Sequence, residues 1–274
     1  MKNILISGGT GFLGRELIAY LHRHKFENIT VLARNEGKLI ELKELYPNIN
    51  IIPGDVADAY ICRKAVTDID TIFHLSAFKH VGMAETETYQ CVSSNIDGTI
   101  NLLNEFHGDL FVAISTDKAA KISGVYGASK YIMEKLIEEY SKYNRTIRYV
   151  VPRYGNVLGS TGSILPKWIE AAKNHKAIKI TEPKCTRFFF TVDDAVDLIF
   201  EAIEKGDNGK PYISHMKACY IGTLATAIEK KYGKYEHIEL IGLQEGENLN
   251  EYLDKDYCSR DADKFTTDDL MEMI

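Results

Sequence analysis

The sequence predicts an α/β protein built on a doubly wound parallel sheet, with a smaller C-terminal lobe. Short apolar runs alternate with amphipathic stretches from the N-terminus to Val151. A glycine-rich turn follows the first apolar run directly. Beyond Val151 the alternation loosens into a turn-rich loop and separated helical stretches. Alternating strands and helices are typical of a parallel sheet that helices cover on both faces.

The first strand is expected at residues 2–7, an apolar run bounded by glycines. A helix follows at residues 12–24, because Leu13, Leu17 and Leu21 fall on one helical face. By the same reasoning we expect strands at 29–33, 50–53, 71–75, 110–114 and 147–151, and helices at 36–46, 86–106 and 125–143.

The lobe is expected to begin with a loop at residues 155–162. Helices at 164–173, 192–205 and 224–232 follow, with short strands between them. We divide the chain into a dinucleotide-binding domain, residues 1–155, and a smaller substrate-binding lobe, residues 156–274, interleaved with it. The acidic tail from residue 254 is expected on the surface.

Composition excludes several classes of protein. The 274 residues are 45 % hydrophobic and 26 % charged, which is ordinary for a globular chain. The net charge of -6 repels polyphosphate at long range and argues against nucleic acid as the partner. Without a signal peptide or an apolar run of ~18 residues, we expect a cytoplasmic protein with no membrane partner. The five cysteines are odd in number and unclustered, which favours reduced thiols and no metal site.

The glycine-rich turn has the Gly-x-x-Gly-x-x-Gly spacing of a Rossmann dinucleotide site. The first glycine permits the tight turn, the second lets the backbone approach a pyrophosphate, and the third lets the helix pack against the strand. The N-terminal amides of that helix then face the diphosphate. The cofactor-binding residues expected here are Gly8, Thr10, Gly11, Phe12, Leu13 and Gly14.

The end of the second strand favours NADP over NAD. NAD enzymes usually place an acidic residue there, on the ribose hydroxyls. Here Arg34 ends the strand and Lys38 follows one turn later, so both can pair with a 2′-phosphate. Asp55, followed by Val56 after the third strand, is placed to accept a hydrogen bond from adenine. Plain solvated helix-start residues and a turn aspartate stay open as alternatives.

Tyr126 and Lys130 form the predicted redox pair. They are four residues apart and share one face of the predicted helix at 125–143. An ammonium beside a phenol lowers the pKa of the phenol, which suits Tyr126 to remove a hydroxyl proton as hydride leaves the same carbon. Lys130 can also hold the nicotinamide ribose, and Thr116 can bond the substrate hydroxyl.

Asp117 and Lys118 directly follow Thr116 and add a second acid/base pair. A simple dehydrogenase needs no such pair. An enzyme that removes a proton next to a ketone and expels water does need one. A pair that merely caps the loop is the alternative.

These motifs resemble the extended short-chain dehydrogenase/reductases. Within that group the sequence is most similar to C5-inverting UDP-N-acetylglucosamine 4,6-dehydratases of the polysaccharide biosynthesis family. The resemblance covers roughly residues 3–257. Besides the glycine turn, it rests on the runs at 115–120, 126–130, 77–80, 153–160, 186–188 and 246–247.

The resemblance implies a complete reaction. Tyr126 helps oxidise C4 of the sugar and hydride passes to NADP. Lys118 removes the acidified C5 proton while Asp117 assists loss of the C6 hydroxyl, and the reverse assignment stays open. Hydride returns to C6 and C5 is reprotonated from the opposite face.

The resemblance also implies further site residues and partners. Leu75, Ala77, Lys79, Asn95, Tyr154, Asn156 and Val157 would contact the cofactor, and Lys79, Asn156, Ser163, Arg187 and Glu247 the substrate. The implied partner is a UDP-sugar, with UDP-N-acetylglucosamine expected, and the implied assembly is a homo-oligomer.

The substrate side departs from the family pattern. Thr161 stands where relatives carry arginine, and residues 243–248 lack the usual Ile-Arg-Pro-Gly-Glu-Lys. Positive charges that would match a diphosphate are therefore missing. A UDP-sugar 4-epimerase, which returns hydride to C4, is the alternative enzyme. A non-catalytic NADP-binding sensor is the alternative of another class.

Overall fold

The computed structural model of the chain describes residues 1–160 and 162–274. Its main sheet consists of β1 (Asn3–Ser7), β2 (Asn28–Ala33), β3 (Asn50–Pro53), β4 (Thr71–His74), β5 (Leu110–Ala113), β6 (Ser115–Thr116), β7 (Arg148–Tyr154) and β11 (Pro211–Tyr212). The strand order is β11-β7-β5-β4-β1-β2-β3, with β6 beside β7, and every pair is parallel. The predicted doubly wound parallel fold is confirmed.

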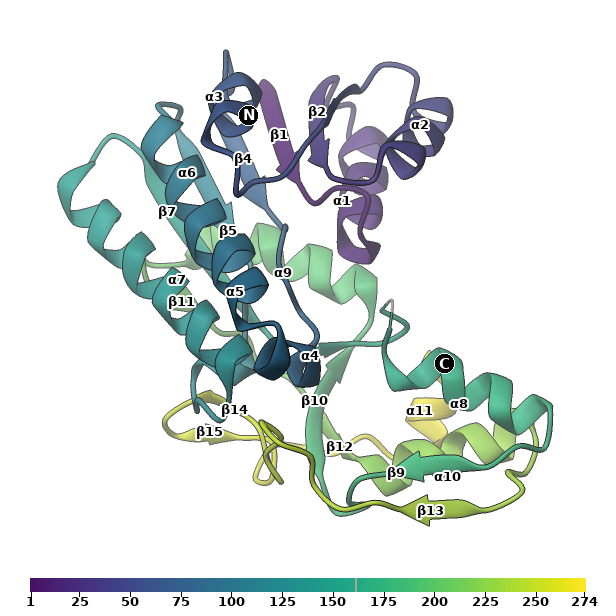
Figure 1. Cartoon of the computed structure of the whole chain (residues 1–274). Coiled ribbons are helices and arrows are strands. Elements are labelled where there is room, and N and C mark those ends of the chain that lie inside the picture. The colour runs from purple at the N-terminus through teal and green to yellow at the C-terminus, as the bar shows by residue number, and fades with distance from the viewer. Residues whose placement is uncertain (161) are drawn as a thin grey trace.

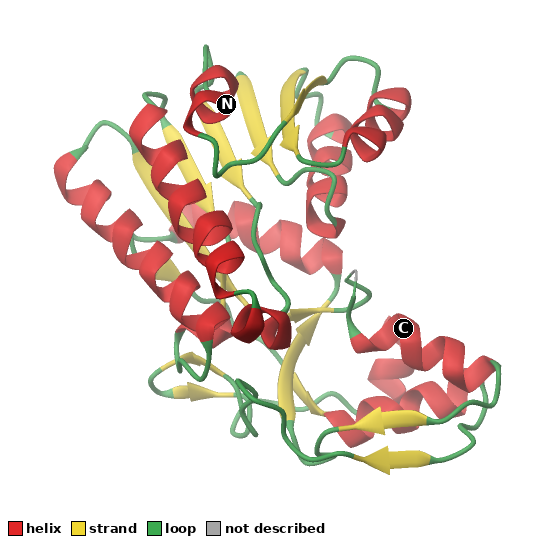
Figure 2. Cartoon of the chain, in the orientation of Figure 1, coloured by secondary structure: helices red, strands yellow, loops and turns green. Residues whose placement is uncertain are grey.

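Helices cover both faces of this sheet, as Figures 1 and 2 show. Side chains alternate along a strand, so Ile4 and Ile6 face one layer while Leu5 faces the other. The first layer contains α1 (Phe12–Arg23), α2 (Glu36–Leu45) and α9 (Val192–Lys205). The second contains α3 (Ala59–Ala65), α6 (Gly98–Glu105) and α7 (Val125–Tyr143).

The smaller lobe has its own core around Trp168, Leu224 and Leu270. Its helices are α8 (Ile164–Lys173), α10 (Ile221–Tyr232) and α11 (Thr267–Met273). Its strands are β8 (Asn156–Val157), β9 (Ile178–Ile180), β10 (Thr186–Phe190), β12 (Ala218–Tyr220), β13 (Ile238–Leu240), β14 (Tyr252–Asp254) and β15 (Tyr257–Cys258). Because α9 and β11 return to the main sheet, the chain crosses between the two parts more than once (Figure 1).

The single helix expected at residues 86–106 is wrong. The structure has α4 (Val81–Thr86), α5 (Thr88–Val92), a π-helical turn at Ser93–Asp97 and then α6. Asn95 in that turn bonds both backbone groups of Phe78: its Oδ1 accepts from the amide at 2.7 Å and its Nδ2 donates to the carbonyl at 3.0 Å. π-helical turns are rare, occur mostly as single turns within α-helices and are frequent at functional sites.

Two other expectations need correction. Helix α3 lies in a stretch for which no element was predicted; Asp58 caps it by accepting bonds from the amides of Tyr60 and Ile61. The tail from residue 254 is not simply exposed, because Cys258, Ser259 and Leu270 are buried. Leu270 and its neighbours pack in the core of the lobe, whereas Tyr257 and Ala262 pack against the core that α9 shares with the main sheet. None of the described helices is both long and apolar enough to cross a bilayer.

Candidate active site

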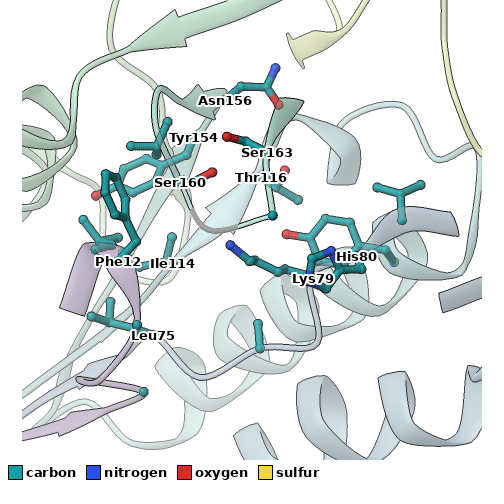
Figure 3. Close-up of a pocket in the computed structure, with 18 of the residues that line it drawn as sticks. Phe12, Leu75, Lys79, His80, Ile114, Thr116, Tyr154, Asn156, Ser160 and Ser163 are labelled. Carbon is teal, nitrogen blue, oxygen red and sulfur yellow. The ribbon is translucent and has the colours of Figure 1, made fainter. Parts of the chain in front are cut away.

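A cavity of about 850 Å³ lies where the carboxyl ends of the main-sheet strands meet the lobe. In open parallel sheets, ligands bind at this edge, where the strand order reverses. Figure 3 shows the Lys79 amine extending into the cavity, with Phe12 and Leu75 on one side and Ser163 on another. The predicted residues that line it are Gly8, Thr10, Gly11, Phe12, Leu13, Gly14, Arg34, Lys38, Asp55, Val56, Leu75, Ala77, Lys79, Thr116, Lys118, Tyr126, Lys130, Tyr154, Asn156, Val157, Ser163, Arg187 and Glu247.

The glycine turn packs so closely against neighbouring backbone that two of its positions require glycine. Gly8 has a φ of +77°, and a Cβ there would lie 2.7 Å from the amide nitrogen of Ser76. A Cβ on Gly14 would lie 2.6 Å from the Cα of Gly9. Gly11 is the N-cap of α1 and supplies no side-chain cap, so the first amides of α1 are left for a ligand. These residues therefore fit a dinucleotide.

The end of the cavity next to β2 and β3 contains both signs of charge. Arg34 Nη1 lies 3.6 Å from Asp55 Oδ2 on the cavity wall; the Arg34 side chain is largely exposed and the Asp55 side chain is half-buried. Asp55 Oδ1 accepts the amide of Ala57 at 3.0 Å, which is a turn contact. The Arg34 guanidinium keeps donors for a further anion, because the contact with Asp55 uses one edge of its fork.

Tyr126 is half-buried on the cavity wall, close to Thr116. Burial raises the pKa of Tyr126, whereas the charge of Lys118 and the nearby Thr116 hydroxyl oppose that rise. The cation that lowers this pKa here is Lys118, whereas the same role for Lys130 stays a prediction. Lys130 Nζ instead donates to Met133 Sδ at 3.0 Å, and burial lowers the pKa of Lys130 to about 8.

Lys118 carries the charge next to Tyr126. Its Nζ donates to Asp117 Oδ1 at 3.0 Å and lies 3.7 Å from Glu251 Oε1. Burial lowers the pKa of Lys118, but the two carboxylates raise it further, so the net pKa lies above the ordinary value. Lys118 therefore rests as an ammonium group on the cavity wall.

Asp117 and Asn95 are the two predicted site residues that do not line the cavity. Asp117 is 0 % exposed; it accepts bonds from Thr116 and Lys118 on Oδ1, while Oδ2 has no hydrogen-bond partner among the described atoms. Asn95 is turned toward Phe78 and Ser129, to which its Nδ2 donates. Both lie behind the cavity wall and support the residues that form it.

The guanidinium group of Arg187 already contacts other groups of the protein. Its Nη2 lies 2.8 Å from Glu247 Oε1, and its Nη1 donates to the carbonyls of Thr186 and Leu249. Its Nε lies 3.7 Å from Glu251 Oε1. A substrate diphosphate would have to displace at least one of these contacts to bind the guanidinium.

The remaining predicted residues are placed as follows. The Tyr154 hydroxyl donates to the carbonyl of Ala195, so only its ring faces a ligand. Asn156 Nδ2 donates to the carbonyl of Phe188 at 3.3 Å. Ser163 Oγ is buried and has no hydrogen-bond partner among the described atoms. Thr161, where relatives carry arginine, lies outside the described residues.

Sequence reasoning missed part of the site. Lys179 and Thr181 of the lobe line the cavity, as do His80, Trp168 and Phe189. Glu251, behind Lys118, was also missed. His80 falls in the run at 77–80 that the resemblance singles out, so the sequence could have indicated it; the others reach the site only through the fold of the lobe.

Comparison with known proteins identifies the family. The polysaccharide biosynthesis protein family matches residues 4–271. A Methanocaldococcus jannaschii protein, named only as an uncharacterized membrane protein, is 36 % identical over 92 % of this chain and 80 % of its own length. The inverting UDP-N-acetylglucosamine 4,6-dehydratase of Campylobacter jejuni is 32 % identical over 92 % of this chain and 77 % of its own. Rickettsial proteins named UDP-glucose 4-epimerase match at about the same identity.

Solved structures agree with the fold. The structure titled Pen, from Bacillus thuringiensis, superposes with a TM-score of 0.93 at 28 % identity and covers 100 % of this chain and 96 % of its own. The relatives are thus nucleotide-sugar dehydratases and epimerases by name, and the glycine turn, Tyr126 and Lys130 stand together in one cavity here. This chain therefore belongs to the polysaccharide biosynthesis protein family, a branch of the short-chain dehydrogenase/reductases.

Proposed function

We propose that this protein is an NADP-dependent UDP-N-acetylglucosamine 4,6-dehydratase that inverts C5. The observation that carries the proposal is the Lys118 ammonium, which lines the same cavity as Tyr126 and Lys130 and is hydrogen-bonded to Asp117. A redox pair alone serves a dehydrogenase or an epimerase. A second acid/base group on the same wall is what water loss requires.

Tyr126 and Thr116 serve the first step in this proposal. A nicotinamide dinucleotide bound at the glycine turn would supply the hydride acceptor and later the hydride donor. Tyr126 takes the proton of the C4 hydroxyl, and Thr116 holds that hydroxyl in place. Lys118 stabilises the phenolate, because its positive charge opposes the effect of burial on the pKa of Tyr126.

Lys118 serves the second step. In its resting ammonium form it can donate a proton to the leaving C6 hydroxyl. To act as the C5 base it first passes its proton to a neighbouring carboxylate, and Asp117 Oδ1 lies 3.0 Å away. Asp117 is then the partner that changes the protonation of Lys118, since its own oxygens do not reach the cavity.

The choice of NADP rests on Arg34 and Lys38, both of which line the end of the cavity next to β2 and β3. A cytoplasmic location rests on the composition. A homo-oligomer is supported by exposed apolar side chains on α5 and α7, where Tyr89 is 76 %, Tyr131 39 % and Ile132 42 % exposed. Apolar side chains of this size favour burial against a second copy.

A UDP-sugar 4-epimerase is the second candidate, because relatives of similar identity carry that name. It shares the first step and needs Tyr126 and Lys130. It has no use for Lys118 as a proton donor to a leaving hydroxyl.

The deciding experiment incubates the purified protein and NADP with UDP-N-acetylglucosamine. The proposal expects a product lighter by one water in mass spectrometry, with the alkali-induced absorbance of a 4-keto sugar. A product of equal mass and different C4 configuration would establish epimerisation instead. Bound NADP with no turnover of any nucleotide sugar would favour a sensor. Lys118→Ala is expected to abolish water loss and to retain bound cofactor; full activity in that variant would refute the role of Lys118.

A further inference from the structure

Glu251 is a buried carboxylate that no motif of the sequence marks. It lies just before β14, and its side chain is 2 % exposed. Its Oε1 is 3.7 Å from Lys118 Nζ and 3.7 Å from Arg187 Nε. Its Oε2 is buried and has no hydrogen-bond partner among the described atoms. A buried carboxylate costs free energy unless cations compensate it.

The charges around Lys118 come from several elements. Asp117 lies in the 3-10 turn after β6, Glu251 before β14 and Arg187 on β10, and each contributes to the pKa of Lys118. Tyr126 on α7 is the remaining titratable group that interacts with it. The side-chain charges therefore alternate in sign along a series of ion pairs that runs through Asp117, Lys118, Glu251, Arg187 and Glu247.

We propose that Glu251 is a positioning residue that sets the charge state of Lys118 and holds its amine against the cavity wall. The contact at 3.7 Å acts through Lys118, because Glu251 itself does not line the cavity. Without Glu251, Asp117 would be the single carboxylate within ion-pair distance of Lys118 among the described residues. The role of Lys118 in water loss rests on the proposed function, whereas the Glu251–Lys118 contact does not.

The proposed proton transfers between Lys118, a neighbouring carboxylate and the substrate restore every group to its starting protonation state by the end of water loss. As Lys118 passes a proton to a carboxylate, an N–H bond breaks and an O–H bond forms. The amine then takes the C5 proton, the C–H electron pair forms the C5–C6 double bond, and the C6–O bond breaks. The leaving hydroxyl takes a proton from Lys118 and departs as water, and the carboxyl group returns its proton to Lys118. The ease of the first transfer depends on how strongly Glu251 stabilises the ammonium form.

Competitive labelling tests the contact without turnover. Trace acetic anhydride acetylates neutral amines only, so the labelling of Lys118 relative to exposed Lys64, read by peptide mass spectrometry, reports its neutral fraction at a fixed pH. An opposite charge within about 4–6 Å shifts a pKa by about one unit or more, so Glu251→Gln is expected to raise relative labelling of Lys118 about tenfold. Glu245→Gln, an exposed carboxylate on the same segment, is the matched control and should leave it unchanged.

Glu251→Asp makes the proposal testable if the glutamine variant does not fold. Shortening the side chain moves the charge away from Lys118, so labelling should lie between the wild type and Glu251→Gln. Equal labelling of Lys118 in the wild type and in every folded variant would overturn the proposal. In the dehydration assay, the limb of the pH–rate profile that belongs to Lys118 should move to lower pH in Glu251→Gln.

The two proposals fail separately. If labelling shifts as expected but no nucleotide sugar loses water, the proposed function is wrong and the contact stands. If water is lost and labelling does not change, the inference about Glu251 is wrong and the proposed function stands.

Discussion

Arg153 and Glu134 form a bidentate ion pair in the interior, and Glu134 lies on α7 one turn beyond Lys130. Nη2 lies 2.6 Å from Oε2 and Nε lies 3.0 Å from Oε1. Ser115 donates to the same Oε1 at 2.5 Å, and Arg153 Nη1 donates to the carbonyl of Leu253 at 2.6 Å. The pair thus joins β7 and the segment of Leu253 to α7, one turn beyond Lys130.

Removing one member of this pair should destabilise the protein strongly. Arg153→Leu leaves the Glu134 carboxylate buried without its cation, at a cost of about 3–5 kcal/mol in the free energy of unfolding. The double variant Arg153→Leu, Glu134→Leu should lose clearly less than the sum of the two single changes. Urea unfolding of the four proteins measures this, and simple additivity would show that the two side chains are not coupled.

Tyr126→Phe should remove turnover and leave the fold intact. The change deletes only the hydroxyl, which lies close to Thr116. Proton transfer by a positioned side chain contributes about 10²–10⁴-fold, so kcat should fall at least 100-fold. Tyr131→Phe, on the next turn of α7 and 39 % exposed, is the control and should keep its activity. Retention of activity by Tyr126→Phe would exclude the phenol as the acid/base group.

Arg34→Gln should reduce the preference for NADP over NAD. A charged hydrogen bond to the 2′-phosphate is worth about 1.5–3 kcal/mol, so the ratio of the two Kd values should change about tenfold or more. Titration calorimetry with each dinucleotide measures the ratio. Arg23→Gln, an exposed arginine paired with Glu16 on α1, is the control. An unchanged ratio would mean that Arg34 does not contact a phosphate.

Gly14→Ala should abolish dinucleotide binding. The new Cβ would lie 2.6 Å from the Cα of Gly9, so the backbone of the turn has to move. Overpacking of this kind costs about 1–3 kcal/mol in stability. Gly82→Ala on α4 meets nothing within 4 Å and should keep both Tm and affinity. Normal cofactor affinity in Gly14→Ala would show that the close packing of α1 against the turn is not needed for binding.

Asp70 should contribute stability that depends on pH. Partial burial raises its pKa, but the amides of Asn3 and Lys2 and the hydroxyl of Thr71 lower it more, so the net pKa is below the ordinary value. A depressed carboxyl pKa stabilises the fold above the unfolded pKa of about 3.9 and loses that effect as the pH falls through the folded pKa.

The corresponding variant is Asp70→Asn. At neutral pH it should lose about 1 kcal/mol in the free energy of unfolding, a low value because solvent screens the site. The difference from the wild type should shrink as the pH falls below about 4. Thermal unfolding at several pH values measures it, with exposed Asp68→Asn as the control. A difference that does not depend on pH would show that the carboxylate charge is not involved.

Local signals explain what the sequence could predict. The turn at Gly8 and Gly14 follows from spacing, because only glycine fits where a Cβ would meet backbone atoms. Tyr126 and Lys130 share a face because residues four apart on a helix do so. The alternation of strands and helices predicted the parallel sheet. It also predicted the bounds of most elements to within a few residues.

Contacts between distant segments explain what the sequence could not predict. The stretch 86–106 has a continuous helical pattern, and only the bonds of Asn95 with Phe78 show why a π-turn interrupts it. The burial of Leu270 depends on the core of the lobe, which the acidic composition of the tail conceals. The charge state of Lys118 depends on Glu251, which approaches it only after the lobe has folded.

The ion pair of Lys118 with Glu251 and the hydrogen bond of Arg153 with Leu253 have a consequence for synthesis on the ribosome. The N-terminal strands can pair while the rest is being translated, because domains begin to fold as their residues emerge. Leu253 follows Arg153 by 100 residues, and Glu251 comes just before Leu253. A nascent chain halted before residue 251 would therefore display a nearly complete main sheet in which Lys118 and Arg153 still lack these partners.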